Sequence, residues 1–123
     1  MDELVLIVDD DERNAKLARD VLEQAGMRTL TAATAAAGLA LAREHLPDVV
    51  LMDLRLPDLD GAEAARLLAA DEQTAGTPVI ALSALSAGQP CGWLLDAGFA
   101  AYIEKPIDVC RLPEQVRQHC ADR

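Results

Sequence analysis

Short aliphatic runs recur along the chain, and stretches with helical periodicity separate them. The runs lie at Leu4–Val8, Arg28–Ala32, Asp48–Asp53, Pro78–Ser83 and Ala100–Glu104. Runs that stay apolar instead of alternating with polar residues are typical of parallel strands covered on both faces. Strict alternation of strands and helices favours right-handed crossovers. The pattern therefore predicts an α/β fold, a doubly wound five-stranded parallel sheet with five helices.

The first helix is predicted between the first two runs. Its apolar stripe follows the i, i+3, i+4, i+7 spacing through Ala18, Val21, Leu22 and Ala25. Gly26 is a typical helix stop. Asp11 and Glu12 at its start are acids that the helix dipole stabilises, which favours a structural role for them.

Two further helices have clear start signals. The alanine-rich segment Ala35–Arg43 is predicted to be helical with Thr34 as its N-cap, and Pro47 ends the helix. A third helix is predicted after Gly61. Its apolar face is predicted to carry Ala64, Leu67 and Leu68.

Composition and charge narrow the class of protein. The 123 residues, 51% hydrophobic and 26% charged, fit a single soluble domain over residues 1–123. The formal charge of −10, without any Lys/Arg-rich run, argues against direct binding to nucleic acid. Three cysteines without CxxC spacing indicate neither a disulfide framework nor a zinc site. No signal peptide or membrane-spanning run is evident, so we expect a cytoplasmic protein with no membrane partner.

Polar residues follow several of the predicted strands. In "LIVDDDE", Asp9 and Asp10 follow the first strand; Asp53 ends the third, Ser83 ends the fourth, and Lys105 lies just beyond the fifth. Ligands of doubly wound sheets bind beyond the carboxyl ends of the strands, so these five groups should converge on one rim. Close carboxylates repel one another, and a hard divalent cation, Mg²⁺ above all, would relieve that repulsion.

A Mg²⁺ site with a hydroxyl and an ammonium group beside it provides the groups that phosphoryl transfer uses. In that reaction the protein mainly positions groups and neutralises charge on the phosphoryl oxygens. A carboxylate can itself be the nucleophile and form an aspartyl phosphate. The residues alone leave open which aspartate attacks.

Four separated motifs, "LIVDDDE", "VVLMDLRLPDLDG", "PVIALSA" and "AYIEKP", occur in the order and spacing of response-regulator receiver domains. The chain resembles this family over essentially its whole length, in the layout of a stand-alone receiver. The resemblance implies a flavodoxin-like strand order, 2-1-3-4-5, and a phosphoacceptor of two-component signalling. It also makes Asp53 the phosphorylated nucleophile. Asp9 and Asp10, with Asp53 and the backbone carbonyl of Arg55, would hold Mg²⁺.

The resemblance assigns the remaining site residues too. Ser83 would bond a phosphoryl oxygen, and Lys105 would balance its charge. Tyr102 matches the family's switch aromatic, although packing at the sheet edge is the alternative. Arg55 and Leu85 flank the position from which water would attack, and this pair offers no carboxylate or amide to orient a water, so we expect a fairly stable phosphoryl group.

The implied partners are proteins. A histidine kinase or histidine phosphotransfer protein would donate the phosphoryl group. A downstream protein would bind the face made by the fourth helix, the fifth strand and the fifth helix. The oligomeric state stays open, with a phosphorylation-dependent dimer as one alternative. The receiver would not be an enzyme, although it assists its own phosphorylation and dephosphorylation.

Two other functions fit part of the pattern. A haloacid-dehalogenase-type phosphatase would use Asp9 as its nucleophile, with Ser83 and Lys105 in support, but the G-[TV] that follows such a motif is missing. A pseudo-receiver would be a folded interaction module that is not phosphorylated. A calcium loop around Asp58 and Asp60 is rejected, because the first and last positions of that register are leucines.

Overall fold

The computed structural model describes residues 3–54, 56–83, 99–104 and 108–119. One parallel sheet runs through it in the order β2-β1-β3-β4-β5, the flavodoxin-like order. The strands are β1 (Leu4–Val8), β2 (Arg28–Ala32), β3 (Val49–Asp53), β4 (Val79–Ser83) and β5 (Ala101–Glu104). The predicted sheet is confirmed, and β3, β4 and β5 each begin one residue later than predicted.

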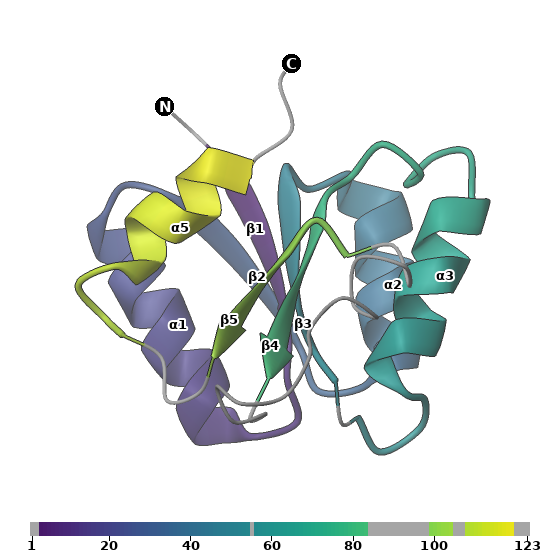
Figure 1. Cartoon of the computed structure of the whole chain (residues 1–123), viewed down its shortest axis with the longest axis horizontal. Helices are drawn as coiled ribbons and strands as arrows, with labels where there is room; N and C mark the ends of the chain where they lie inside the picture. Colours follow the sequence, from purple (N-terminus) through teal and green to yellow (C-terminus); the bar gives the residue numbers. More distant parts are fainter. Residues whose placement is uncertain (1–2, 55, 84–98, 105–107, 120–123) are drawn as a thin grey trace.

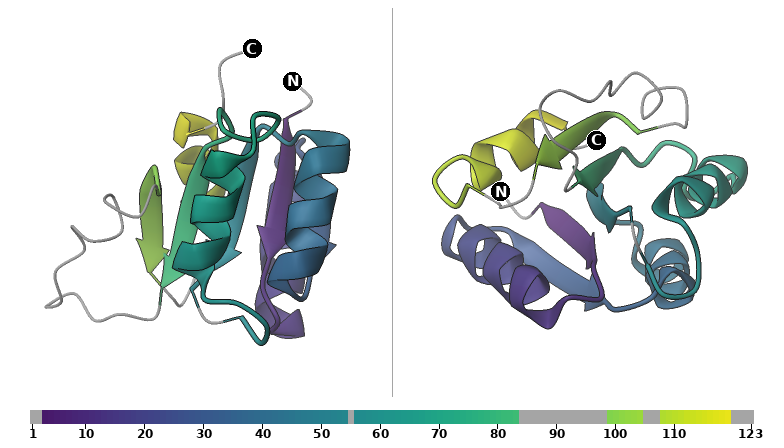
Figure 2. Two further views of the ribbon diagram at one scale, coloured as in Figure 1. Left: turned by 90° about the vertical axis from the view of Figure 1, so that its right-hand side faces the viewer. Right: turned by 60° about the horizontal axis from the view of Figure 1, so that its bottom comes forward.

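Four helices are described: α1 (Glu12–Gln24), α2 (Ala35–His45), α3 (Gly61–Ala70) and α5 (Leu112–His119). The helix predicted between β4 and β5 falls in residues 84–98, outside the described part. α1 and α5 cover one face of the sheet, and α2 and α3 cover the other (Figures 1 and 2). α2 ends at His45, two residues before the predicted helix stop at Pro47. Among the described helices, none is long and apolar enough to cross a bilayer.

The sheet is buried on both faces, which explains its continuous apolar strands. Alternate side chains of one strand point to opposite faces. In β1, Val5 and Ile7 pack with α1 and α5, whereas Leu6 and Val8 pack with α2 and α3. The central strands β1 and β3 therefore have no face on which a polar side chain meets solvent.

The predicted Thr34 cap of α2 is confirmed, and Asp11, which was expected as an acid of the first turn, is the N-cap of α1. The Asp11 carboxylate accepts a hydrogen bond from the Arg13 N–H at 2.9 Å. The Thr34 hydroxyl accepts one from the Ala37 N–H at 3.1 Å. Each bond satisfies a backbone donor that the first turn of a helix leaves without an intrahelical partner.

One prediction for α3 is wrong. Leu67 was expected on the apolar face with Ala64 and Leu68, but its side chain is 38% exposed while the other two are buried. The buried stripe of α3 is centred on Gly61, Ala65 and Leu68. At 3.6 residues per turn, Leu67 lies well outside that stripe. Leu67 therefore does not share the buried face of Leu68, although the two leucines are adjacent in the sequence.

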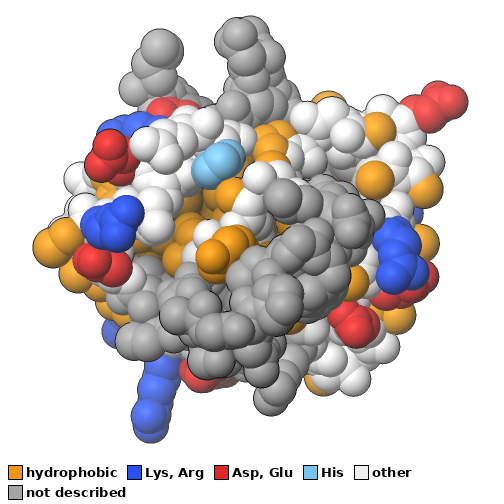
Figure 3. Space-filling view, in the orientation of Figure 1, with side chains coloured by type: hydrophobic (Ala, Val, Ile, Leu, Met, Phe, Trp, Pro, Cys, Tyr) orange, Lys and Arg blue, Asp and Glu red, His pale blue; other side chains and the backbone are white. Residues whose placement is uncertain are grey.

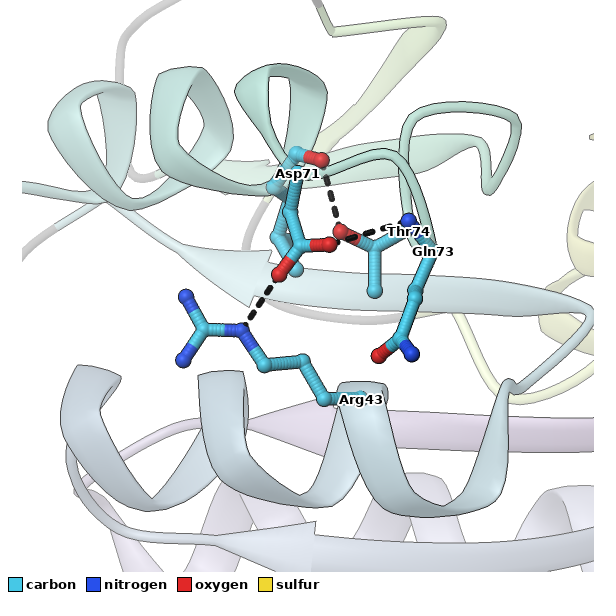
Figure 4. Close-up of polar contacts among 5 residues, drawn as sticks. Arg43, Asp71, Gln73 and Thr74 are labelled. Carbon is cyan, nitrogen blue, oxygen red and sulfur yellow. Dashed lines mark hydrogen bonds and ion pairs between the residues drawn. The ribbon is translucent and has the colours of Figure 1, made fainter.

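α2 is joined to the end of α3 by polar contacts around Asp71 (Figure 4). The Arg43 Nε donates to one carboxylate oxygen of Asp71 at 2.6 Å, and the Gln73 N–H donates to the other at 2.9 Å. The Thr74 hydroxyl donates to the Leu68 carbonyl at 2.6 Å. The backbone bond from Gln73 and then the Arg43 guanidinium hold the pKa of Asp71 below its ordinary value.

These contacts predict a pH-dependent contribution to stability. Because the folded-state pKa of Asp71 is lowered, its contribution is present above the ordinary carboxyl pKa of about 4 and is lost as the pH falls through the lower folded value. Asp71→Asn should lower the melting temperature by about 1–3 °C at pH 7. The difference from wild type should shrink below about pH 4.

Melting curves by circular dichroism from pH 7 to pH 3 measure this effect, with Glu72→Gln as the matched charge change at the neighbouring exposed position. A deficit in Asp71→Asn that stays constant across the range would contradict the account.

Candidate functional site

The carboxyl ends of β1 and β3 bring two aspartates side by side. Val8 is paired in register with Met52, so the next residues, Asp9 and Asp53, continue the same parallel ladder. Asp53 is the last residue of β3. The strand arrows end at the lower edge in Figure 1, and the right-hand view of Figure 2 brings this edge forward. The acids thus lie on the rim where this fold binds ligands.

Asp10 completes a cluster of three carboxylates. One oxygen from each of Asp9, Asp10 and Asp53 lies within 4.8 Å of the others. Asp9 is 3% exposed and Asp53 is 7% exposed, whereas Asp10 is open to solvent. The predicted convergence of these three residues is confirmed.

The turn after β1 holds Asp9 in place. Its N–H donates to the Ala32 carbonyl at the end of β2, at 3.0 Å. One of its carboxylate oxygens accepts from the Asp11 N–H at 2.9 Å. Since Asp11 also caps α1, the start of that helix and the first acid of the cluster share one tight turn.

The loop after Asp53 is held at both of its ends by backbone hydrogen bonds that involve Leu54. The Leu54 N–H donates to the Leu82 carbonyl of β4 at 3.3 Å, and the Gly61 N–H donates to the Leu54 carbonyl at 3.0 Å. A Cβ at Gly61 would lie 2.7 Å from the Leu54 Cα and closer still to the Asp53 carbonyl oxygen. Only glycine lets α3 begin this near the backbone of Asp53.

The acid cluster fits a hard divalent cation. Its donors are carboxylate oxygens, the ligands that Mg²⁺ and Ca²⁺ prefer. Two of the three groups are buried, so their negative charges are poorly screened by water, and a cation is the natural compensation. Exposed Asp10 leaves an approach from solvent.

The other predicted site residues are described only in part. Ser83 ends β4 and is paired with Glu104 of β5, which puts its backbone at the same rim. The Ser83 side chain, Arg55, Leu85 and Lys105 lie outside the described residues. Their roles stay predictions.

Tyr102 lies on the edge strand β5, opposite Ala81 in register, and its side chain is 42% exposed. An exposed aromatic at the sheet edge is compatible with either of the roles considered for it. The switch role of Tyr102 also stays a prediction.

Two acids of the loop after β3 turn out to be helix caps. The Asp60 carboxylate accepts from the Ala62 N–H at 2.8 Å and caps α3. The Asp58 carboxylate accepts from the Ala35 and Ala36 N–H groups of α2, at 2.8 and 2.9 Å. An aspartate directly before a helix is a recognisable N-cap signal. The link of Asp58 to α2, more than twenty positions away, has no such signal.

Comparison with known proteins identifies the family of this chain. The family model of the response regulator receiver domain matches residues 5–117. The polar-differentiation response regulator DivK of Brucella ovis is 39% identical over 122 residues, which cover 99% of each chain.

Solved receivers also share the fold. A CheY-like receiver domain protein from Methanospirillum hungatei JF-1 has a TM-score of 0.85 at 30% identity, covering 96% of this chain and 93% of that one. The receiver domain of the sensor histidine kinase PA1611 from Pseudomonas aeruginosa PAO1, described with a magnesium ion coordinated in its active-site cleft, has a TM-score of 0.87 at 29% identity. It covers 97% of this chain and 98% of that one. With its sheet order, acid cluster and matched motifs, this chain belongs to the response-regulator receiver domain family, the signalling phosphoacceptors of two-component systems.

Proposed function

We propose that Asp53 is the phosphoacceptor of this receiver, and that a histidine kinase or histidine phosphotransfer protein is the donor. A carboxylate oxygen of Asp53 attacks the phosphorus of the partner's phosphohistidine. The new P–O bond forms as the P–N bond breaks, and the imidazole leaves with the electron pair. The product is an aspartyl phosphate.

The placement of Asp53 carries this proposal. Asp53 is the last residue of the central strand β3 and is 7% exposed. Its carboxylate lies in one cluster with those of Asp9 and Asp10. A structural role such as a helix cap would not explain why three carboxylates share this space, because their mutual repulsion is costly. Asp11, Asp58 and Asp60 do act as caps, and they lie outside the cluster.

The proposed cofactor is Mg²⁺. Asp9, Asp10, Asp53 and the backbone carbonyl of Arg55 would hold it. The bound ion would offset the negative charge of the phosphoryl oxygens. Asp9 is held by its bonds to the turn after β1, so it can keep its carboxylate aimed at the cluster while the phosphoryl group arrives.

The remaining site residues complete the proposal. Ser83 bonds a phosphoryl oxygen, Lys105 balances its charge, and Arg55 with Leu85 sets a slow hydrolysis of the acyl phosphate. No external substrate is turned over, so the chain is not an enzyme in the ordinary sense, although it assists its own phosphorylation and dephosphorylation. Residues 1–123 act as one receiver domain in the cytoplasm.

The output is a protein contact on the side of β5 and α5. Figure 3 shows this side, where hydrophobic side chains gather beside atoms that are not described. Tyr102 and Val109 are 42% and 44% exposed there. We expect a downstream protein, or a second copy of the phosphorylated chain, to bind this face when Ser83 and Tyr102 respond to the phosphoryl group.

Phosphorylation by a small donor tests the proposal. With acetyl phosphate and Mg²⁺, the intact mass of the wild-type chain should rise by one phosphoryl group, and a chelator should prevent the gain. The phosphoryl group moves from acetate oxygen to carboxylate oxygen, and acetate leaves. Failure to gain phosphate at any Mg²⁺ concentration, in a protein that melts cooperatively, would favour a pseudo-receiver that only binds partners.

A further inference from the structure

Asp58 joins the loop that follows Asp53 to a different layer of secondary structure. Both of its carboxylate oxygens accept backbone N–H bonds from the first turn of α2, from Ala35 at 2.8 Å and from Ala36 at 2.9 Å. These two bonds hold the pKa of Asp58 below its ordinary value. Thr34 accepts the bond from Ala37. The first turn of α2 thus has one cap from its own segment and one from the loop after β3.

The loop after β3 is attached to the rest of the domain at several points, and Asp58 provides the polar one to α2. Between Asp53 and Gly61 the chain leaves β3, and it returns so closely that the Gly61 N–H bonds to the Leu54 carbonyl. Leu56 and Leu59 are partly buried against the core on the α2 and α3 side. Asp58 lies between these two leucines in the sequence. Its two directional hydrogen bonds to α2 hold the loop in a defined position, which packing of the leucines alone would not do.

α2 in turn lies against the strand that carries the other acids. A Cβ at Gly38 would come within 2.7 Å of a Val8 methyl group, so this helix and β1 are in close contact. Val8 directly precedes Asp9, and the Asp9 N–H bonds to the Ala32 carbonyl just before α2 begins. Asp58 therefore connects the loop after Asp53 to α2, the helix that packs against β1 directly before Asp9.

We propose that Asp58 is a positioning residue for the acid cluster: by binding the first turn of α2, its carboxylate holds the loop after Asp53 in the arrangement that takes up the cation and the phosphoryl group. This inference rests on the proposed phosphoacceptor function. The three carboxylates of the cluster repel one another until a cation arrives. A loop that is held beforehand does not have to be ordered at the moment of binding, so less of the binding free energy is lost.

Asp58→Ala should weaken Mg²⁺ binding. We expect the Mg²⁺ dissociation constant, measured by calorimetry on the whole chain, to rise about tenfold, at the low end of what outer-shell residues contribute to metal affinity. Asp58→Asn should have a smaller effect, since its amide oxygen accepts one of the two N–H bonds while its NH₂ group cannot accept the other.

Thr34→Ala is the matched control. It removes a cap from the same turn of α2 without detaching the loop. Both alanine variants should lower the melting temperature, but Thr34→Ala should keep the Mg²⁺ dissociation constant within about twofold of wild type, because the bond that it removes joins Thr34 to Ala37 and does not hold the loop after β3. In acetyl phosphate labelling, saturating Mg²⁺ should restore most of the rate of Asp58→Ala, because Asp53 itself is intact.

The two proposals fail in different ways. If wild type neither binds Mg²⁺ nor gains phosphate, the phosphoacceptor function is wrong. If wild type does both, and Asp58→Ala matches it in Mg²⁺ affinity or is weakened no more than Thr34→Ala, then Asp58 is a helix cap only and the positioning role is overturned.

Discussion

Replacing Asp53 by asparagine is expected to remove covalent uptake of phosphate from acetyl phosphate. The amide has nearly the shape of the carboxylate, so the buried end of β3 should stay folded, but it lacks the anionic oxygen that would attack phosphorus in the proposed reaction. Labelling should fall at least about 100-fold, to the background of the intact-mass measurement. Asp71→Asn, at the α2–α3 contact, is a control that should label like wild type.

Asp9→Asn separates this function from the phosphatase alternative. In the proposed receiver, Asp9 would hold the cation, so its loss should weaken Mg²⁺ binding while Asp53 can still be labelled at high Mg²⁺. In a haloacid-dehalogenase-type phosphatase, Asp9 would be the nucleophile, and the same change would abolish labelling. Loss of labelling in Asp9→Asn together with full labelling of Asp53→Asn would contradict the assignment made here.

Gly61→Ala is expected to damage both the fold and the site. The new methyl group would lie 2.7 Å from the Leu54 Cα and nearer to the Asp53 carbonyl oxygen. Both obstacles are backbone atoms, which cannot rotate away as a side chain can. We expect the free energy of unfolding to fall by about 2–3 kcal/mol, in the range for overpacked sites. The phosphorylation rate should fall as well, because α3 would be pushed away from Asp53.

Two other glycines serve as controls for Gly61→Ala. Gly76→Ala adds a methyl group into open space and should leave stability nearly unchanged. Gly38→Ala meets side-chain atoms of Val8 at 2.7 and 3.1 Å, and these can shift, so its effect should be intermediate. Urea unfolding curves rank the three variants. Equal stability of Gly61→Ala and Gly76→Ala would show that the start of α3 can move without cost.

The sheet and the cluster could be predicted because their signals are local. Each strand is a continuous apolar run, and parallel order brings the residues after Val8 and Met52 to one rim. Three carboxylates at such a rim are expensive without a function, so composition and position together indicate the site. The clustering of their carboxylate oxygens confirms this expectation for Asp9, Asp10 and Asp53.

What could not be predicted depends on contacts between distant segments. The bond from Ala35 to Asp58 spans 23 positions, and nothing near either residue indicates it. The prediction for Leu67 was wrong for a related reason. Two adjacent leucines on one helix are equally apolar in the sequence, and only the packing of the helix against the sheet determines which of them is buried. The sequence predicts a helix after Gly61, but the close approach of Gly61 to Asp53 depends on how α3 meets β3.

Locating the phosphoryl group within the wild-type chain shows whether Asp53 is the phosphoacceptor. The chain is phosphorylated with acetyl phosphate and Mg²⁺, and borohydride then reduces the acyl phosphate to an alcohol, which marks the aspartate permanently for peptide mapping by mass spectrometry. We expect a single reduced residue, Asp53. Reduction at Asp9 or Asp10, with Asp53 unmodified, would contradict it.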